Sequence, residues 1–231
     1  MSKSLLTASL LALAVAAPSA MAHKAGDIII RAGAIEVAPD SKSSSVKFDR
    51  GPATGTNIGG KAKVGDDTQL GLNFAYMITD QIGVELLAAT PFTHSVKLRG
   101  TSVASANGKL GTLKHLPPTL SAVYYPELSF LSPSFKPYIG AGINYTWFMN
   151  GHTSSEARGN GFRNLRADDS WAWAAQIGWD YMLNDNLLIN AQVRYIDLDT
   201  TAYVDHTALG RAKVDVDIRP WVYMFGLGYK F

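Results

Sequence analysis

The chain has 231 residues, of which 47% are hydrophobic, 17% are charged and none is cysteine, and its formal net charge is +2. The charged fraction is below the roughly 25% that is usual for soluble domains, and the high hydrophobic fraction excludes a disordered chain. The absence of cysteine excludes a disulfide scaffold. A nearly neutral chain with no basic stretch gives no reason to expect a nucleic-acid partner.

The first 22 residues have the features of a secretory signal peptide. Lys3 supplies a positive charge, the apolar run Leu5–Ala17 follows, and the small-residue site Ala20-Met21-Ala22 comes last. The run is well short of the roughly 20 residues that a membrane-spanning helix needs. A buried amphipathic helix is the alternative, but the run holds only Thr7 and Ser9 as polar residues. We predict cleavage after Ala22 and a single mature domain, residues 23–231.

Large apolar residues alternate with small or polar residues along most of the remaining chain. In residues 171–181, for example, Trp171, Trp173 and Trp179 share one face, whereas Ala172 and Ala174 share the other. This period of two predicts β-strands rather than helices. We predict eight strands: Asp27 to Val37, Thr68 to Ile78, Ile82 to Leu98, Leu110 to Pro126, Lys136 to Phe148, Asp169 to Met182, Leu187 to Tyr203 and Lys213 to Phe231.

Short and long connections alternate between these strands. The short ones are 79–81, 127–135 and 184–186, and the long ones are 38–67, 99–109, 149–168 and 204–212. Such alternation is typical of the periplasmic turns and extracellular loops of outer-membrane barrels. The connection 38–67 is rich in serine and glycine, so we expect it to be the least ordered part.

The composition of the two strand faces distinguishes a membrane barrel from a soluble one. The polar face holds Gly, Ala, Asn and Gln rather than bulky charged residues, which suits a narrow interior, and aromatic residues gather near strand ends. Lipid accepts no unpaired backbone group, so strands within it must close into a ring. We predict an all-β fold, an eight-stranded antiparallel transmembrane β-barrel with short periplasmic turns and longer extracellular loops. A lipocalin-like soluble barrel is the alternative.

Motifs from end to end of the mature chain carry a family resemblance. They include HKAGD at 23–27, TQLGL at 68–72, VELLAATPF at 84–92, LPPT at 116–119, DSW at 169–171 and PWV at 220–222. With these motifs the chain resembles the outer membrane protein W (OmpW) family. Within that family it resembles the OprG branch most. Tyr229 and Phe231 also resemble the terminal aromatic signal that the barrel assembly machinery reads.

The resemblance implies a bacterial outer-membrane barrel, taller than the membrane, that passes small apolar or small uncharged solutes. The implied partners are outer-membrane lipid, lipopolysaccharide and the barrel assembly machinery, and no cofactor is implied. In this family an opening in the wall is thought to release solute sideways.

Three prolines are candidates for that opening. Pro91 matches the family's strand proline, and proline lacks the N–H that a strand ladder needs. Pro117 and Pro118, on the next strand, would widen the same gap if they fall opposite Pro91. The alternative places Pro91 at the rim, above the membrane.

Strand parity assigns charged side chains to the interior. If Ile82, Val84 and Leu86 face lipid, Glu85 and Leu87 face inward. The resemblance implies that Leu87 contributes to an apolar constriction. In the family, the partner of this residue is a tryptophan on the seventh strand, but this chain has Arg194 at that position. The inward-facing charges are then Arg31, Glu85, Asp180, Arg194 and Lys230. Buried charges need partners, so ion pairs such as Arg194 with Glu85 or Asp180 would plug the barrel. A packed structural salt-bridge core is the alternative.

The sequence holds no convincing catalytic or metal site. Its five histidines are scattered, with no pair at metal-ligand spacing on one strand face. Asp205-His206, and His152 beside Ser154 and Ser155, are weak catalytic candidates, and an outer-membrane acyltransferase or protease remains a hypothesis. We expect no enzyme, metal or cofactor, but a passive pore. The alternative function is a closed surface barrel serving adhesion, stress resistance or recognition by external agents, without transport.

Overall fold

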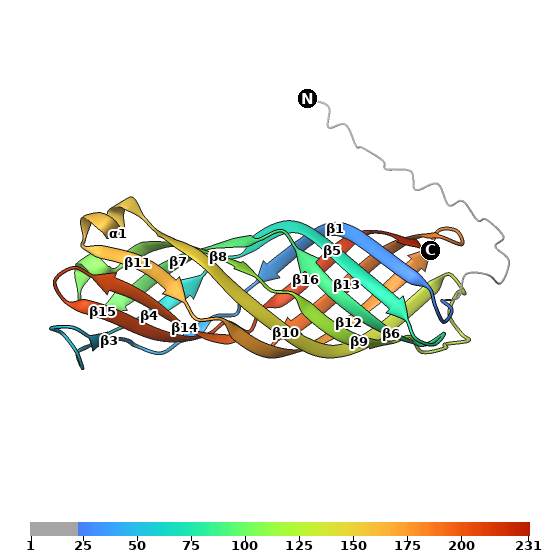
Figure 1. The fold of residues 1–231 in the computed structure, drawn as a ribbon, viewed down its shortest axis with the longest axis horizontal. Helices are drawn as coiled ribbons and strands as arrows, with labels where there is room; N and C mark the ends of the chain where they lie inside the picture. Colours follow the sequence, from blue (N-terminus) through green and yellow to red (C-terminus); the bar gives the residue numbers. More distant parts are fainter. Residues whose placement is uncertain (1–22) are drawn as a thin grey trace, which may run out of the picture.

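The computed structural model describes residues 23–231, and the predicted signal peptide lies outside the described residues. The strands form one elongated cylinder, with the short helix α1 (Ser155–Gly159) toward one end and the carboxyl terminus at the other (Figure 1). No helix within residues 23–231 is long and apolar enough to span a membrane. The strands are β1 (Ile28–Ala38), β2 (Lys42–Ser43), β3 (Val46–Arg50), β4 (Asn57–Val64), β5 (Asp67–Met77), β6 (Ile82–Ala89), β7 (Phe92–Thr101), β8 (Gly108–Leu116), β9 (Thr119–Tyr124), β10 (Phe135–Thr153), β11 (Phe162–Ala167), β12 (Ser170–Met182), β13 (Leu187–Ile196), β14 (Asp199–His206), β15 (Gly210–Asp217) and β16 (Trp221–Lys230).

The strands make two stacked rings. In the first ring, antiparallel pairs run β1-β5-β6-β9-β10-β12-β13-β16 and return to β1, which closes an eight-stranded barrel. The second ring continues the same cylinder with β11-β14-β15-β3-β4-β7-β8 and the far end of β10. The predicted eight-stranded antiparallel barrel is therefore confirmed.

The predicted strand bounds are wrong where the two rings meet. Only β10 runs unbroken through both rings, and four predicted strands are divided in two: Ile82 to Leu98 into β6 and β7, Leu110 to Pro126 into β8 and β9, Leu187 to Tyr203 into β13 and β14, and Lys213 to Phe231 into β15 and β16. Three of these four breaks contain proline (Pro91, the pair Pro117 and Pro118, and Pro220), whereas the break between β13 and β14 contains none. Proline donates no backbone hydrogen bond, so a ladder tends to end there.

Three predicted long connections are largely strand. Residues 38–67, which were expected to be the least ordered part, contain β2, β3 and β4. Residues 149–168 contain the end of β10, α1 and β11. The predicted connection 204–212 is reduced to a turn at residues 207–209. The reason is that Val46, Phe48 and Ile58 bury their side chains inside the second ring. A short apolar alternation within a serine- and glycine-rich segment is enough to pair once neighbouring strands are present.

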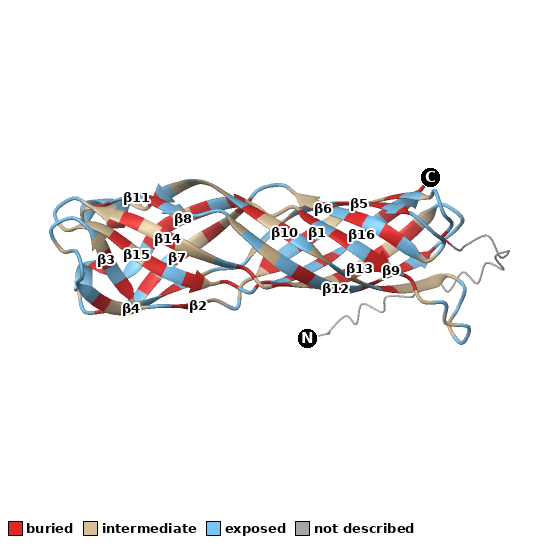
Figure 2. Ribbon diagram, turned by 60° about the horizontal axis from the view of Figure 1, so that its bottom comes forward, coloured by how far each residue is buried: buried red, intermediate tan, exposed pale blue. Residues whose placement is uncertain are grey.

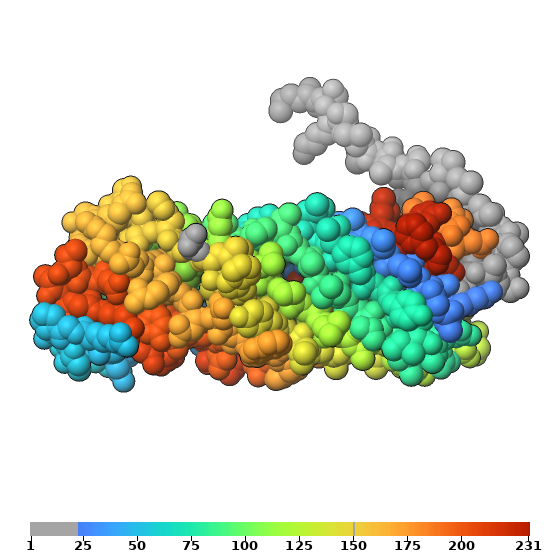
Figure 3. Space-filling model, in the orientation of Figure 1, coloured from blue at the N-terminus to red at the C-terminus, as the bar shows by residue number. Residues whose placement is uncertain are grey.

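The outside of the first ring is an apolar belt. Buried and exposed residues alternate along its strands (Figure 2), and the exposed positions are mostly large hydrophobic residues. Aromatic side chains border the belt on both sides: Trp147, Trp171 and Trp221 next to the second ring, and Tyr76, Tyr124, Tyr181 and Tyr229 at the other edge. The terminal strands β1 and β16 lie side by side and seal the cylinder (Figure 3). This belt has the pattern of a surface solvated by lipid.

Candidate functional site

An ion pair crosses the interior of the first ring. Arg31 of β1 donates to Asp180 of β12 through Nε (2.9 Å to Oδ1) and Nη2 (2.5 Å to Oδ2), and both side chains are fully buried. The Tyr125 hydroxyl accepts from Arg31 Nη2 at 2.8 Å and lies 3.2 Å from Asp180 Oδ2. A two-bond contact of this kind is strong and fixes the orientation of both groups.

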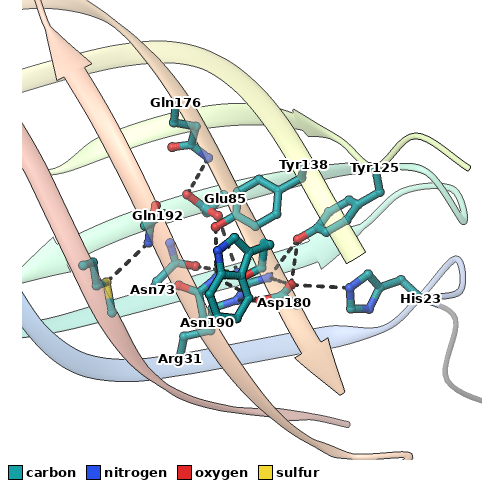
Figure 4. A network of polar contacts seen from close by, with 12 residues as sticks. His23, Arg31, Asn73, Glu85, Tyr125, Tyr138, Gln176, Asp180, Asn190 and Gln192 are labelled. Atoms are coloured by element: carbon teal, nitrogen blue, oxygen red, sulfur yellow. Dashed lines mark hydrogen bonds and ion pairs between the residues drawn. The ribbon is translucent and has the colours of Figure 1, made fainter. Parts of the chain in front are cut away.

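A second ion pair lies beside the first. Arg194 of β13 donates to Glu85 of β6 at 2.7 Å, and Gln176 of β12 bridges them, accepting from Arg194 and donating to Glu85 at 2.9 Å. Arg31 Nη1 lies 3.5 Å from Glu85 Oε2, which joins the two pairs into one network (Figure 4). We call this network the polar plug. Its members are Arg31, Asn73, Glu85, Tyr125, Gln176, Asp180, Asn190 and Arg194, and Figure 4 labels all of them except Arg194.

The polar plug balances two positive charges against two negative charges. Burying any one of them alone would be costly, so their mutual pairing is a condition of the fold. Glycine makes room for it: a Cβ at Gly228, which pairs with Arg31 in register, would lie 2.9 Å from Arg31 Cγ and 2.6 Å from Leu188 Cδ1. His23 Nε2 lies 3.4 Å from Asp180. Lys230 stands apart from the plug, 3.6 Å from Asp27.

An apolar cavity of about 50 Å³ lies where the two rings meet. We call it the chamber. Its lining comes from both rings and is almost entirely apolar: Val37, Pro39, Ala62, Val64, Val96, Leu113, Phe148, Ala167, Leu198, Ala202, Val216, Ile218 and Pro220, with Thr200, His94 and His115. Leu87 is buried in the apolar cluster that surrounds this level, together with Ile35 and Phe92.

Two stacked histidines form part of the chamber wall. The rings of His94 (β7) and His115 (β8) are 4.8 Å apart, and they stack with Phe92 and pack against Phe148. His94 Nδ1 lies 2.5 Å from the Gly65 carbonyl. Within residues 23–231, His94 Nε2 and His115 Nδ1 have no hydrogen-bond partner. Burial lowers the pKa of His94, and it lowers the pKa of His115 to about 3 with a further contribution from His94.

Backbone pairing is interrupted in one wall of the barrel. The ladder between β6 and β9 ends at Leu87 and Thr119, and the ladder between β7 and β8 begins at Phe92 and His115. Within residues 23–231, no pair joins 88–91 to 116–118, although Ala88 and Ala89 pair with β5 and Leu116 pairs with β10. We call this interruption the seam.

The three prolines singled out in the sequence all lie in the seam. Pro91 is on one side, and Pro117 and Pro118 are on the other. Asn144 of β10 donates from Nδ2 to the carbonyls of Pro117 (3.0 Å) and Pro118 (3.1 Å). The Asn144 side chain therefore bonds two carbonyls at the seam, and the Pro118 carbonyl also accepts from the Tyr145 amide of β10.

Several members of the site were missed by sequence reasoning. Strand parity would have placed Asn73, Gln176 and Tyr125 in the interior, since Tyr125 follows the end of β9 and continues its alternation of buried and exposed residues. His94 and His115 were read as scattered because they are far apart in the chain. The Phe92–His115 register of the β7–β8 hairpin brings them together.

The weak catalytic candidates make structural contacts. Ser154 caps the start of α1 and accepts from the Ala157 amide, Asp205 pairs with Arg166, and the His206 ring packs against Phe162. Within the described chain, no group of three or more histidine, aspartate or glutamate residues could hold a metal ion. Tyr229 and Phe231 lie on the apolar outer face with their rings 4.7 Å apart.

Comparison with known proteins identifies the family. The OmpW family model matches residues 24–231. Outer membrane protein W of Escherichia coli is 42% identical over 231 residues (99% of this chain, 100% of that protein), and the Vibrio cholerae protein of the same name is 41% identical over 218 residues (94% of each). The crystal structure of OprG from Pseudomonas aeruginosa superposes with a TM-score of 0.83 at 47% identity, covering 91% of this chain and 98% of that one. With its closed eight-stranded ring and apolar belt, the chain belongs to the OmpW family of bacterial outer-membrane β-barrels.

Proposed function

We propose that the barrel gives passive passage to small apolar or small uncharged solutes, and that these leave sideways through the seam into the membrane. The observation that carries the proposal is the position of the seam. It interrupts the wall at Pro91, Pro117 and Pro118, at the level of the apolar chamber, whereas the polar plug fills the axis of the first ring below.

The plug makes the axial route unfavourable. A solute moving straight down the barrel would have to separate Arg31 from Asp180 or Arg194 from Glu85, which leaves charges buried without partners. A sideways route avoids this cost, because an apolar solute would move from an apolar chamber directly into hydrocarbon. In this proposal Arg194 closes the axis instead of contributing to an apolar constriction with Leu87.

The chamber must widen for a solute to pass. Its volume of about 50 Å³ is only a little more than the share of one water molecule, roughly 30 Å³. Widening is easiest where the fewest backbone hydrogen bonds must break, and the seam has none across residues 88–91 and 116–118. The prolines therefore act as positioning residues for the opening.

A closed barrel without transport is the second candidate function. The packed polar plug and the small chamber favour it, because an eight-stranded barrel can be filled entirely by its own side chains. Such a barrel would serve adhesion, stress resistance or recognition at the cell surface. No catalytic role is proposed, and the relatives compared above are named outer membrane proteins.

Uptake into lipid vesicles tests the proposal. Purified protein is reconstituted, and the entry of an alkane-like fluorescent solute, a small uncharged polar solute and a small anion is followed against protein-free vesicles. We expect faster entry of the first two and no change for the anion. Vesicles that show no accelerated entry of either uncharged solute would leave the closed barrel as the function.

We also propose that residues 1–22 are removed on export and that Tyr229 and Phe231 guide assembly. Mass spectrometry of the mature protein should find His23 as the first residue. Replacing Phe231 with Ala should lower the amount of folded barrel in the outer membrane, whereas replacing Phe130 with Ala, in the β9–β10 turn and also exposed, should not.

A further inference from the structure

Three neighbouring strands of the second ring carry only basic charges on their outer face. The charged residues exposed on β4, β7 and β8 are Lys61, Lys63, Lys97, Arg99, Lys109 and Lys114. We call this set the basic ladder. It contains no aspartate or glutamate.

Strand register places five of these six cations directly opposite another cation. Lys61 pairs with Arg99, Lys63 pairs with Lys97, and Lys97 pairs with Lys109 on its other side. Side chains opposite each other on one sheet face are about 5 Å apart at Cβ, and like charges at that spacing destabilise the sheet. The arrangement therefore opposes the stability of the empty barrel.

On the other side of the same ring, three cations have carboxylate partners, whereas Lys47, Arg50 and Arg163 have no ion pair within residues 23–231. There Arg166 pairs with Asp205, Lys213 with Asp215, and Arg211 with Asp49. Within residues 23–231, no member of the basic ladder has an ion pair, and the one hydrogen bond is from Lys61 Nζ to the Ser43 carbonyl at 2.8 Å. The feature specific to this face is its lack of carboxylates: β3, β14 and β15 each contain aspartate, whereas β4, β7 and β8 contain no acidic residue.

The basic ladder also contains a hollow. A surface depression of about 500 Å³ lies over the β7–β8 hairpin, and Lys97, Arg99 and Lys109 contribute to its lining with the polar Asn107. Three cationic donors around one depression suit a ligand that carries anionic groups, whereas the Asn107 amide is already bonded to the backbone of Thr101 and Val103.

The position of the ladder indicates where such a ligand would come from. Lys114 is two residues along β8 from Leu116, which pairs with Trp147 at the border of the apolar belt. From Lys114 the ladder extends away from the belt, at about 3.3 Å per strand residue. It therefore begins at the membrane surface, at the height of the headgroups of the outer leaflet.

We propose that the basic ladder binds the phosphate-bearing saccharide of lipopolysaccharide in the surrounding outer leaflet. Phosphates would neutralise the opposed cations, and sugar hydroxyls would bond the exposed backbone of the hollow. This proposal does not depend on transport, because the ladder lies outside the barrel.

Binding of a soluble probe tests the site. Full-length barrel in phosphatidylcholine nanodiscs is titrated with the saccharide released from rough lipopolysaccharide by deacylation, and with the same saccharide after phosphatase treatment. We expect binding that weakens with salt and that is lost on removal of phosphate. The triple variant Lys97→Gln, Arg99→Gln, Lys109→Gln should bind roughly tenfold to a hundredfold more weakly.

A matched variant separates the site from overall charge. Arg166→Gln, Lys213→Gln and Arg219→Gln remove the same charge from cations that have carboxylate partners, and they should change affinity by less than about twofold. Equal weakening in both variants would overturn the proposal, as would equal binding of the dephosphorylated saccharide or tighter binding of duplex DNA.

Two further measurements test whether the bound saccharide comes from the surrounding membrane and whether the unpaired cations destabilise the fold. When the nanodiscs contain lipopolysaccharide, the soluble saccharide should bind less, because membrane-resident saccharide occupies the site; unchanged binding would overturn the assignment to the outer leaflet. Without ligand, Lys97→Gln should raise resistance to urea by removing repulsion from Lys63 and Lys109, and a fall in that resistance would contradict the unpaired-cation argument.

Discussion

Arg31 and Asp180 face each other across the barrel from β1 and β12, two strands that share no ladder, and two hydrogen bonds of 2.9 and 2.5 Å join them. The contact cross-links opposite walls of the first ring. It adds a contact across the interior that backbone pairing alone does not give.

Removing one member of this pair should destabilise the barrel strongly. Asp180→Leu leaves the Arg31 guanidinium buried beside Asn73 and Tyr125 without a carboxylate partner of its own, and we expect the free energy of unfolding to fall by about 3–5 kcal/mol. The double variant Arg31→Met, Asp180→Leu should recover most of the loss, because no unpaired charge remains. Urea unfolding in lipid vesicles measures both. Equal stability of the single and double variants would show that pairing is not the cause.

Arg194 belongs to the plug that, in the proposed sideways route, lies beneath the chamber, so its charge should affect which solutes enter the chamber. Arg194→Trp removes one cation from Glu85 and Gln176 and places an apolar ring at the plug, so uptake should shift toward apolar solutes and polar uncharged solutes should slow. The ratio of the two uptake rates in vesicles is the measurement. An unchanged ratio would count against a role for Arg194 in the passage of solutes.

Pro91 should keep the seam open. Pro91→Ala restores a backbone N–H and permits a ladder bond across to 116–118, so release of apolar solute into the bilayer should slow. Pro52→Ala, in the exposed turn between β3 and β4, is the matched control and should leave release unchanged. Environment-sensitive fluorescence of the solute reports its arrival in the bilayer. The idea fails if Pro91→Ala and the parent protein release solute at the same rate.

Acid should loosen the second ring through its stacked histidines. An imidazole in the unfolded chain titrates near its ordinary pKa of 6.5, whereas burial lowers the pKa of His115 to about 3. The unfolded chain therefore binds a proton more readily between these values, and stability falls as the pH drops below about 6.5. We expect a loss of about 2 kcal/mol at pH 5 relative to pH 7.5 from His115 alone.

His115→Phe provides the check on this pH dependence. It keeps the aromatic stack with Phe92 and His94 but cannot be protonated, so its unfolding free energy should change less between pH 7.5 and pH 5. His152→Phe, at an exposed position late in β10, should keep the parent's pH dependence. Identical pH dependence in all three proteins would exclude His115 as the acid-sensitive group.

The first ring could be predicted from the sequence with few errors. The alternation of Trp171 and Trp173 with Ala172 and Ala174 reflects a strand with lipid on one side and a narrow interior on the other, and each residue reports its own environment. The strands of the second ring were harder to predict from the sequence. Its strands β3 and β4 are short and lie in a segment rich in serine and glycine, so their local pattern is weak until β7 and β15 are beside them.

The sequence by itself determined that the chain is an eight-stranded outer-membrane barrel with charges turned inward, because side-chain alternation and composition are local properties. Only the tertiary structure decided that Arg31 pairs with Asp180 and Arg194 with Glu85, that His94 stacks on His115, and that the three prolines share one interruption of the wall. These contacts depend on register and on distances across a closed ring. Parity along one strand says which way a side chain points, but it does not say what stands opposite.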